Sequence, residues 1–382
     1  MGCREPEPTR SSAPIASTQR KDCKLESRIQ KNFPTPHGRA NKSALRQSRG
    51  ILLYDPFRAM TTIYEQITSA LASPTPFALG IISRINGSSP QKKGAKALFF
   101  EDGRIIGTLG GGCLEAEIQD RARRSLQSGQ PTTFELVLDH DFGWDDGLIC
   151  GGKVTGLILP RPAAAKELWQ MLAKRESTIA WGVREDFAIM QLQPPADTSL
   201  LYEETVCPPY NLWIAGSGHV AQAVAPLALN LDFQVTVLDD RPSLANHQFF
   251  PESVRFRIGA WEELLREAVS KPQLFGLIVT RGHHRDALVL SKWIREPFAF
   301  LGLIGSRRKK RLIFEQFVQE GIATEQKLAS VACPVGIDIG SQTVPEIAIS
   351  IAAQLVERRA ELRRCAGLMP TRGSEPLNLA EN

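Results

Sequence analysis

The chain has 382 residues, of which 42% are hydrophobic and 23% charged, with a formal net charge of +5. This is the composition of a globular protein with room for two domains, and it excludes wholesale disorder. Residues 1–59 carry a net charge of +7 and the remainder −2, and no apolar run approaches the length of a membrane span, so we expect neither nucleic-acid binding nor membrane insertion.

The first 59 residues are rich in Ser, Pro, Arg and Lys and show no sustained apolar period. They lack the apolar core of a secretory signal, and Pro6 stands where the myristoylation pattern requires Ser or Thr. We therefore expect a disordered extension, or translated upstream sequence with the true start at Met60. A functional basic arm is the alternative.

Residues 60–192 show the pattern of a small α+β domain. Apolar residues share one helical face at 63–71, and strand-like runs follow at 77–82, 97–100, 104–109, 132–138, 153–159, 178–183 and 187–192. Further helices are predicted over 113–128 and 163–174. Residues 193–210 contain Pro194, Pro195, Pro208 and Pro209, which favours an interdomain linker.

The pattern of apolar residues changes at residue 211. From there, segments typical of buried strands alternate with segments typical of helices. Strands are predicted at 212–215, 234–238, 274–280 and 298–304, and helices near 218–230, 260–270, 285–295, 307–320 and 344–363. This alternation predicts a Rossmann-like domain with a parallel sheet over 211–363. Pro226 lies inside the first of these helices, so we expect a kink or break there. Residues 364–382 are expected to form a disordered tail.

The strongest motif lies at the first strand-to-helix junction of this second domain. Gly216, Gly218 and His219 belong to a Gly-x-Gly-x-x-Ala sequence, the arrangement that places backbone amides and a helix N-terminus against a phosphate. Asp239 ends the next strand, where an acidic side chain accepts hydrogen bonds from a ribose. These residues predict a nucleotide or other phosphate ligand. The alternative is that the glycines only permit close helix–strand packing.

Two later loops follow strands of the same sheet. One contains Arg281 and His283, and the other contains Ser306 and Arg307. Because ligands bind beyond the carboxyl ends of parallel strands, we expect both loops to converge on the glycine turn and to contribute anion contacts. Two alternatives to anion contacts remain. The arginine run can form a solvated helix face, and the histidine can be an ordinary loop residue whose ring nitrogens are hydrogen-bonded within the protein.

In the first domain, Gly110, Gly111 and Gly112 precede Cys113 at a predicted helix start. Successive glycine amides can point into one hollow, and the helix dipole favours the thiolate of a cysteine in the first turn. Cys150 also lies beside a glycine pair. The cysteines form either a soft-ligand or sulfur-handling site, or are small buried hydrophobes. The seven scattered cysteines indicate no disulfide framework or structural zinc, which favours a cytoplasmic protein.

Taken together, these segments resemble the XdhC/CoxI family. In the first domain the resemblance rests on 86–90, 110–117 and 150–152, and in the second on 215–221, 239–242, 280–283, 304–309 and 334–340. It covers essentially residues 61–356, in order. Arg285 stands where the family often has a second histidine, so the resemblance does not carry a paired-histidine role to this chain.

The resemblance implies a maturation factor for a molybdenum hydroxylase such as xanthine dehydrogenase. Such proteins are thought to bind molybdenum cofactor (molybdopterin), to hold it while a cysteine desulfurase supplies the sulfido ligand, and to deliver it to the apoenzyme. The implied cofactor-binding residues are Gly110, Gly111, Gly112, Cys113, Cys150, Gly216, Gly218, His219, Asp239, Arg281, His283, Ser306 and Arg307. Among these, Cys113 is a candidate molybdenum contact, and no firm metal ligand stands out.

We therefore expect a cytoplasmic cofactor-binding chaperone, in the form of a homodimer, with no turnover of its own. The alternative is an NAD(P)-dependent oxidoreductase that uses the same glycine turn and Asp239. A third interpretation is a scaffolding partner of a hydroxylase that binds neither ligand.

Overall fold

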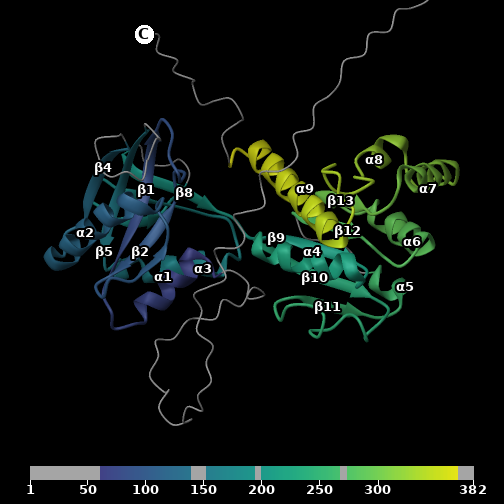
Figure 1. The fold of residues 1–382 in the computed structure, drawn as a ribbon, viewed down its shortest axis with the longest axis horizontal. Coiled ribbons are helices and arrows are strands. Elements are labelled where there is room, and N and C mark those ends of the chain that lie inside the picture. Colours follow the sequence, from purple (N-terminus) through teal and green to yellow (C-terminus); the bar gives the residue numbers. More distant parts are fainter. Residues whose placement is uncertain (1–60, 139–151, 194–198, 267–272, 369–382) are drawn as a thin grey trace, which may run out of the picture. The chain divides into compact units, whose positions relative to one another are not determined.

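The structure, a computed structural model, describes residues 61–138, 152–193, 199–266 and 273–368. It contains an amino-terminal α+β domain and a carboxy-terminal domain with a parallel sheet (Figure 1), which confirms the predicted fold class. The extension predicted over 1–59 lies outside the described residues, as does most of the predicted tail. Within the described part of the chain, no helix combines the length and the apolar character needed to cross a membrane.

The amino-terminal domain is built on an antiparallel five-stranded sheet with the order β3-β2-β1-β5-β4. Its strands are β1 (Phe77–Asn86), β2 (Lys96–Phe100), β3 (Ile105–Gly107), β4 (Thr132–Leu138) and β5 (Gly152–Pro160). Its helices are α1 (Ile63–Leu71), α2 (Gly112–Ser128) and α3 (Lys166–Lys174). The predicted hairpin between β2 and β3 is confirmed by their antiparallel pairing.

Both faces of this sheet are covered, which explains the uninterrupted apolar run in β1. Leu79 and Ile81 belong to a core cluster that contains Trp169 of α3. Their neighbours Ala78 and Ile82 point to the opposite cluster, which contains Ile118 of α2. Alternate side chains of one strand therefore pack against helices on two sides of the sheet.

A second sheet in this domain has the order β7-β6-β8. Its strands are β6 (Ile179–Arg184), β7 (Ile189–Gln191) and β8 (Leu200–Val206). The predicted linker over 193–210 therefore contains a strand, which pairs with β6 in the antiparallel sense. The prolines that suggested a linker flank β8 and do not interrupt its ladder, so they are compatible with a strand.

The second sheet also supplies partners for a buried lysine. The Nζ atom of Lys96 on β2 donates to Oε2 of Glu204 at 2.5 Å and to the hydroxyl of Tyr202 at 3.1 Å. Burial acts to lower the pKa of Lys96, against the attraction of Glu204. Because both partners lie on β8, the lysine joins β2 to the second sheet.

The carboxy-terminal domain has a parallel five-stranded sheet with the order β11-β10-β9-β12-β13. Its strands are β9 (Tyr210–Ala215), β10 (Phe233–Asp239), β11 (Arg255–Ile258), β12 (Leu274–Ile278) and β13 (Phe300–Leu303). Its helices are α4 (His219–Asn230), α5 (Trp261–Leu264), α6 (His283–Trp293), α7 (Arg307–Gln319), α8 (Glu325–Ala329) and α9 (Val344–Cys365). Strand β11 was not predicted, and α5 is shorter than the helix expected over 260–270.

Helices pack on both faces of this sheet as well. On one face α4 and α9 lie against each other (Figure 1), and Val224 of α4 and Ile351 of α9 share a core cluster. On the other face, Val289 of α6 and Phe317 of α7 belong to a second cluster. Helix α4 continues through Pro226, so of the predicted kink or break, the break is absent. Tertiary packing of the helix on both sides of the proline overrides its local cost.

Candidate functional site

The carboxyl ends of the parallel strands lie in register at one edge of the sheet. Ala215, the last residue of β9, pairs with Leu238 of β10 and with Ile278 at the end of β12, and Ile278 in turn pairs with Leu303 at the end of β13. The glycine turn and the two later loops therefore leave the sheet side by side. This is the convergence that the sequence predicts.

Gly216 makes the sharp turn between β9 and α4. Its φ is +110°, and a Cβ at this position would lie 2.5 Å from the carbonyl oxygen of Val279. Only glycine fits this close approach of two backbones. Helix α4 then begins after Gly218, and no side chain in the described residues caps it. Its first-turn amides therefore point to the edge of the sheet without an intrahelical partner, as an anion site requires.

Asp239 is buried directly beside this turn. Its Oδ2 atom accepts hydrogen bonds from the Ser217 amide at 2.7 Å and from the Ser217 hydroxyl at 2.8 Å. The Arg241 side chain and amide donate three further bonds to the carboxylate. Burial acts to raise the pKa of Asp239, but the bonds from Arg241 and Ser217 prevail and lower it to about 2. With its oxygens occupied in this way, the geometry does not support the ribose contact predicted for Asp239.

An ion pair that the sequence analysis did not identify joins the two later loops. Asp286, fully buried in α6, accepts from the Thr280 amide at 3.0 Å and from the Thr280 hydroxyl at 2.6 Å. Its second oxygen pairs with the Nζ atom of Lys309, which also donates to the Ile304 carbonyl at 3.1 Å. Asp286 lies in the first turn of a helix and Lys309 in a basic run, and neither position alone signals that the two would meet.

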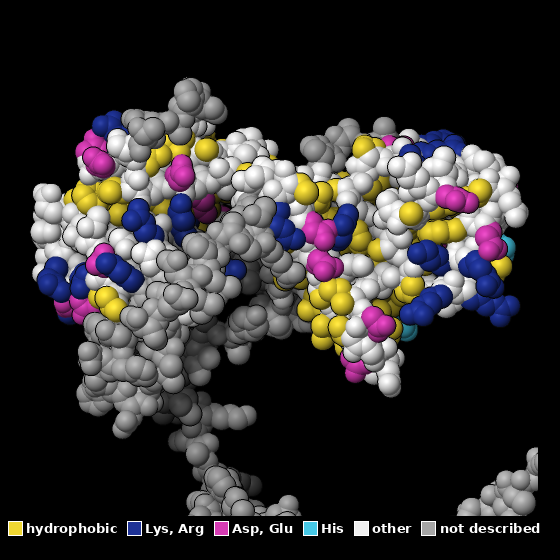
Figure 2. Space-filling view, turned by 90° about the horizontal axis from the view of Figure 1, so that it is seen from above, with side chains coloured by type: hydrophobic (Ala, Val, Ile, Leu, Met, Phe, Trp, Pro, Cys, Tyr) yellow, Lys and Arg dark blue, Asp and Glu magenta, His cyan; other side chains and the backbone are white. Residues whose placement is uncertain are grey.

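The predicted basic and imidazole side chains of this edge are exposed. His219, Arg281, His283 and Arg307 all lie at or next to a helix start on the same side of the sheet. The rings of His283 and His284 are 4.0 Å apart between centroids. Figure 2 shows Lys and Arg side chains gathered over this end of the domain, near α6 and α7. The edge is therefore open and positively charged.

Ser306 has a structural role at the same edge. Its side chain accepts a hydrogen bond from the Lys309 amide at 3.2 Å and so caps α7. The hydroxyl is thus engaged with its own helix, as is typical of a serine at this position. Arg307, the next residue, begins the helix and is exposed.

The glycine turn of the amino-terminal domain differs in one respect from its prediction. Gly110, Gly111 and Gly112 all have positive φ, +135°, +75° and +58°, and α2 begins at the last of them, Gly112. The amides of Leu109 and Gly111, however, donate to Oε1 of Glu115 at 2.9 and 3.1 Å. A side chain of the same helix therefore occupies part of the hollow predicted for a phosphate.

Three segments of the amino-terminal domain meet around this turn. Gly152 approaches the carbonyl of Ser88 so closely that a Cβ would lie 1.9 Å from its oxygen, and a Cβ on Gly110 would lie 3.6 Å from Pro90. The backbone of Cys113 lies in the first turn of α2, as predicted. Cys150 lies outside the described residues. In the described part of the chain, no three His, Cys, Asp or Glu side chains gather as metal ligands.

Comparisons with known proteins agree with both domains. The family described as the XdhC Rossmann domain matches residues 212–355, and the XdhC and CoxI family matches residues 70–137. A crystal structure described as a xanthine dehydrogenase from Bacillus halodurans has a TM-score of 0.67 and 24% identity, and covers 81% of this chain and 97% of that chain. This likeness supports the fold.

Three curated relatives also match. The protein YqeB of Escherichia coli K12, whose function is uncharacterised, is 29% identical over 74% of this chain, and the chain spans 43% of its length. A probable subunit of the xanthine dehydrogenase of Bacillus subtilis 168 is 23% identical over 78% of this chain and 98% of its own length. The molybdenum cofactor insertion chaperone PaoD of E. coli K12 is 25% identical over 81% of this chain and 92% of its own length.

Proposed function

Because this chain belongs to the XdhC and CoxI family, we propose that it binds molybdenum cofactor and inserts it into a molybdenum hydroxylase such as xanthine dehydrogenase. The names of two relatives, a molybdenum cofactor insertion chaperone and a probable xanthine dehydrogenase subunit, support this role. We further propose that the chain acts in the cytoplasm as a homodimer, and that it receives a cysteine desulfurase while it holds the cofactor for sulfuration.

The observation that carries the proposal is the edge of the parallel sheet. The uncapped start of α4 offers amide donors to an anion. The exposed Arg281 lies on one of the two loops that leave the same edge, and the exposed Arg307 begins the helix that follows the other. The cofactor contributes a phosphate and a molybdenum centre when bound. The residues of this edge suit the phosphate, since amides and guanidinium groups both donate to it.

The amino-terminal glycine turn has a different part in this proposal. Glu115 already accepts from the Leu109 and Gly111 amides, so a phosphate would have to displace a carboxylate there. We therefore assign the phosphate to the carboxy-terminal turn and retain Cys113 and Cys150 as proposed contacts of the sulfur or molybdenum centre. The chain's own groups bind and shelter the cofactor, and no turnover by this protein is proposed.

Cofactor content of the purified protein tests the proposal. The full chain should be isolated under anaerobic, reducing conditions from cells with and without active molybdenum-cofactor synthesis, and its molybdopterin quantified by pterin fluorescence. We expect molybdopterin only in the first preparation. Its absence from protein purified out of cofactor-producing cells contradicts the proposal.

A pair of matched variants locates the site. Replacement of Arg281 and Arg307 by Ala should lower the molybdopterin content at least about tenfold, since charge-assisted contacts to a phosphate are lost. Arg311→Ala is the control, because Arg311 lies in α7, the helix that Arg307 begins, and is paired with Glu315. The substitution removes a positive charge from that helix. This control should retain the cofactor. An equal loss in both variants would point to general charge and away from a built site.

The second candidate, an NAD(P)-dependent oxidoreductase, rests on the same glycine turn. Asp239 was its predicted ribose contact, and that carboxylate accepts from Ser217 and Arg241. Tight NADH binding together with reduction of a carbonyl substrate would reverse the ranking of the two functions.

A further inference from the structure

Helix α7 carries a strongly basic segment at the surface of the carboxy-terminal domain. Residues 307–311 are Arg, Arg, Lys, Lys and Arg, and Glu315 is the only acidic residue of the helix. These five cations and one carboxylate give the helix a net charge of +4, whereas residues 60–382 together carry −2. The positive charge is therefore a local feature of this helix and not a property of the whole body of the chain.

The position of these cations within the helix does not favour the helix itself. The first turn of α7 contains no acidic residue, although the amino-terminal end of a helix carries a partial positive charge and prefers Asp or Glu. Lys309 is compensated, because it pairs with the buried carboxylate of Asp286. For the other cations of the run, an anionic surface from outside the chain would supply the missing compensation.

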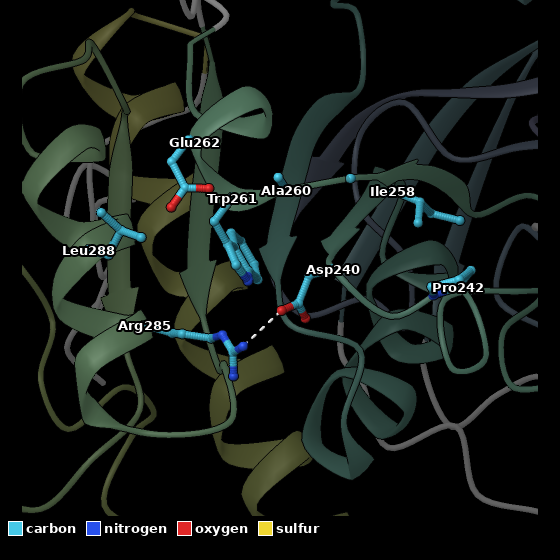
Figure 3. A pocket seen from close by; sticks show the side chains of 9 residues that line it. Asp240, Pro242, Ile258, Ala260, Trp261, Glu262, Arg285 and Leu288 are labelled. Atoms are coloured by element: carbon cyan, nitrogen blue, oxygen red, sulfur yellow. Dashed lines mark ion pairs between the residues drawn. The ribbon is translucent and has the colours of Figure 1, made fainter.

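The arginines at this end of the domain differ in how firmly the chain itself binds them. Arg285 lines a pocket at the end of β10 and pairs there with Asp240 at 2.9 Å (Figure 3). Arg308, in contrast, has no ion-pair partner in the part of the chain that the structure describes. The Nε atom of Arg311 lies 3.9 Å from Oε1 of Glu315, and both side chains are more than half exposed. Exposed pairs contribute little, so Arg308 and Arg311 are available to a partner.

An exposed leucine lies among these arginines. Leu312 is 55% exposed, whereas Ile313 and Phe317, on the opposite side of the helix, are 6% and 2% exposed and face the core. Arg308 lies four residues before Leu312 and therefore one turn away on the same side. Together with Arg311, these two residues form what we call the outer face of α7. An apolar centre with a charged rim is the arrangement of a protein–protein interface.

The composition of the outer face distinguishes between the partners that a basic surface can bind. A membrane-surface helix buries its apolar side in lipid, but Ile313 and Phe317 of α7 are packed in the core. Nucleic acid is bound by basic side chains along its phosphates, and neither Leu312 nor Glu315 on the exposed side of α7 suits phosphates. An acidic protein surface with an apolar centre matches both the arginines and the leucine.

The outer face adjoins the proposed cofactor site. Arg307, a proposed phosphate contact, is the first residue of α7, and Arg308 follows it. The start of the helix is also held to the loop after β12, because Lys309 pairs with Asp286. A protein that docks on the outer face would therefore lie next to the edge from which the cofactor is transferred.

We propose that the outer face of α7 is the surface on which the apo-hydroxylase docks. Arg308 and Arg311 pair with carboxylates of that enzyme, and Leu312 enters an apolar depression between them. The inference rests on the proposed function, because it requires that the chain delivers a cofactor to a hydroxylase. It adds that docking and cofactor binding use different residues of one helix.

Charge reversal tests the electrostatic part of this interface. The full chain should be titrated calorimetrically with apo-xanthine dehydrogenase of the source organism, prepared from cells that synthesise no molybdenum cofactor. A variant with both Arg308→Glu and Arg311→Glu should bind at least about tenfold more weakly, because attraction becomes repulsion. The affinity of the parent should also decrease when NaCl is raised from about 50 to about 300 mM, since salt screens exposed charges.

The control for charge reversal is a second pair of exposed arginines. Arg123 and Arg124 of α2 are 64% and 65% exposed, and both pair with Asp120. The variant with Arg123→Glu and Arg124→Glu has the same change in net charge, so it should bind the apoenzyme as the parent does if the location of the charge matters.

Replacement of the leucine tests the apolar centre. Leu312→Ala should weaken binding about fivefold, because less apolar surface is buried in the complex. Ile349→Ala is the matched control. Ile349 is also 55% exposed but belongs to α9, which packs on the opposite face of the sheet, so this variant should bind as the parent does.

Two results overturn the inference directly. One is a parent protein that does not bind the apoenzyme, and the other is equal affinity of the parent and the charge-reversal variant of Arg308 and Arg311. Binding to vesicles of equimolar phosphatidylserine and phosphatidylcholine is measured in parallel. Vesicle binding that this variant loses, while it still binds the apoenzyme, assigns the outer face to a membrane and also overturns the inference.

Molybdopterin content of the same preparations separates the inference from the proposed function. The charge-reversal variant should contain as much molybdopterin as the parent, because Arg281 and Arg307 are unchanged. Loss of molybdopterin together with loss of docking overturns the separation of the two roles, and with it the inference. A parent that lacks molybdopterin contradicts the proposed function, whereas a parent that contains it but does not dock through α7 overturns only the inference.

Discussion

Each domain places a glycine turn in front of a long helix, but the two turns satisfy their amides in different ways. In the amino-terminal domain Glu115, a residue of the helix itself, accepts from the amides of Leu109 and Gly111. In the carboxy-terminal domain Asp239, from the neighbouring strand, accepts from Ser217 and leaves the start of α4 without a side-chain cap. Glycine patterns therefore predict where amides converge, whereas the nearest carboxylate decides whether the hollow stays open to a ligand.

The sharpest test of this difference is the glycine at the bend of the carboxy-terminal turn. Gly216→Ala should cost about 3 kcal/mol of unfolding free energy, because φ is +110° and the new Cβ would meet the Val279 carbonyl oxygen at 2.5 Å. Urea unfolding followed by tryptophan fluorescence and circular dichroism measures the effect.

Gly218→Ala is the matched control two residues along. Gly218 has a φ of −74°, and a Cβ there meets nothing within 4 Å. Its unfolding free energy should stay within about 0.5 kcal/mol of the parent. Equal destabilisation by both substitutions would mean that the close approach to Val279 does not determine the need for glycine.

The second test concerns the carboxylate that fastens this turn. Its pKa, lowered to about 2, lies below that of an unfolded aspartate, so ionised Asp239 stabilises the fold by about 2 kcal/mol above pH 4. This contribution is lost as the pH falls through about 2. Asp239→Asn should therefore be less stable than the parent by about 2 kcal/mol at pH 7.

The difference in unfolding free energy between the parent and Asp239→Asn should decrease as the pH is lowered from 5 toward 3. Urea unfolding at each pH measures it. Glu315→Gln is a suitable control because Glu315 is 58% exposed, and its effect should be small at every pH. A gap that does not change with pH would show that the ionised carboxylate is not the stabilising group.

The smallest effect is expected at the amino-terminal turn. Partial burial acts to raise the pKa of Glu115, but the bonds from Thr108 and from the turn amides hold it below its usual value. Glu115→Gln should cost about 1 kcal/mol and speed hydrogen exchange at the Leu109 and Gly111 amides. Because the carboxylate stabilises the fold when ionised, this difference should fade as the pH drops below about 4.

Glu117→Gln provides the comparison on the same helix. Glu117 pairs with Arg121 on the helix surface, so its loss should cost at most about 0.5 kcal/mol and leave the turn amides protected. Unchanged hydrogen exchange at the Leu109 and Gly111 amides in both variants would contradict the role of Glu115 as the acceptor of these two amides.

Most of the fold follows from patterns visible in the sequence, with two instructive exceptions. Strand β4 was predicted over the same residues that the structure shows, because its apolar and polar residues alternate. Strand β8 was hidden by the prolines on either side of it, and β11 is a short edge strand whose residues are all at least partly exposed. The local sequence does not predict such strands, because they are stabilised by pairing with strands that are distant in sequence, β6 for β8 and β10 for β11.

The candidate site was predictable in position but not in its contacts. The strand-to-helix junctions locate Gly216, Arg281 and Arg307 at one edge of the sheet. The pairing of Asp286 with Lys309, and the capture of Asp239 by Arg241, depend on side-chain geometry that only the folded chain defines.

The tie between Asp286 and Lys309 has a further consequence for any anion that meets this edge. It holds the loop after β12 to the loop after β13, with Thr280 bonded to the same carboxylate. The backbone conformational entropy of both loops is thus lost when the domain folds and not when a ligand arrives. Arg281 and Arg307 start from preorganised positions, so only their side-chain rotamers remain to be ordered on binding.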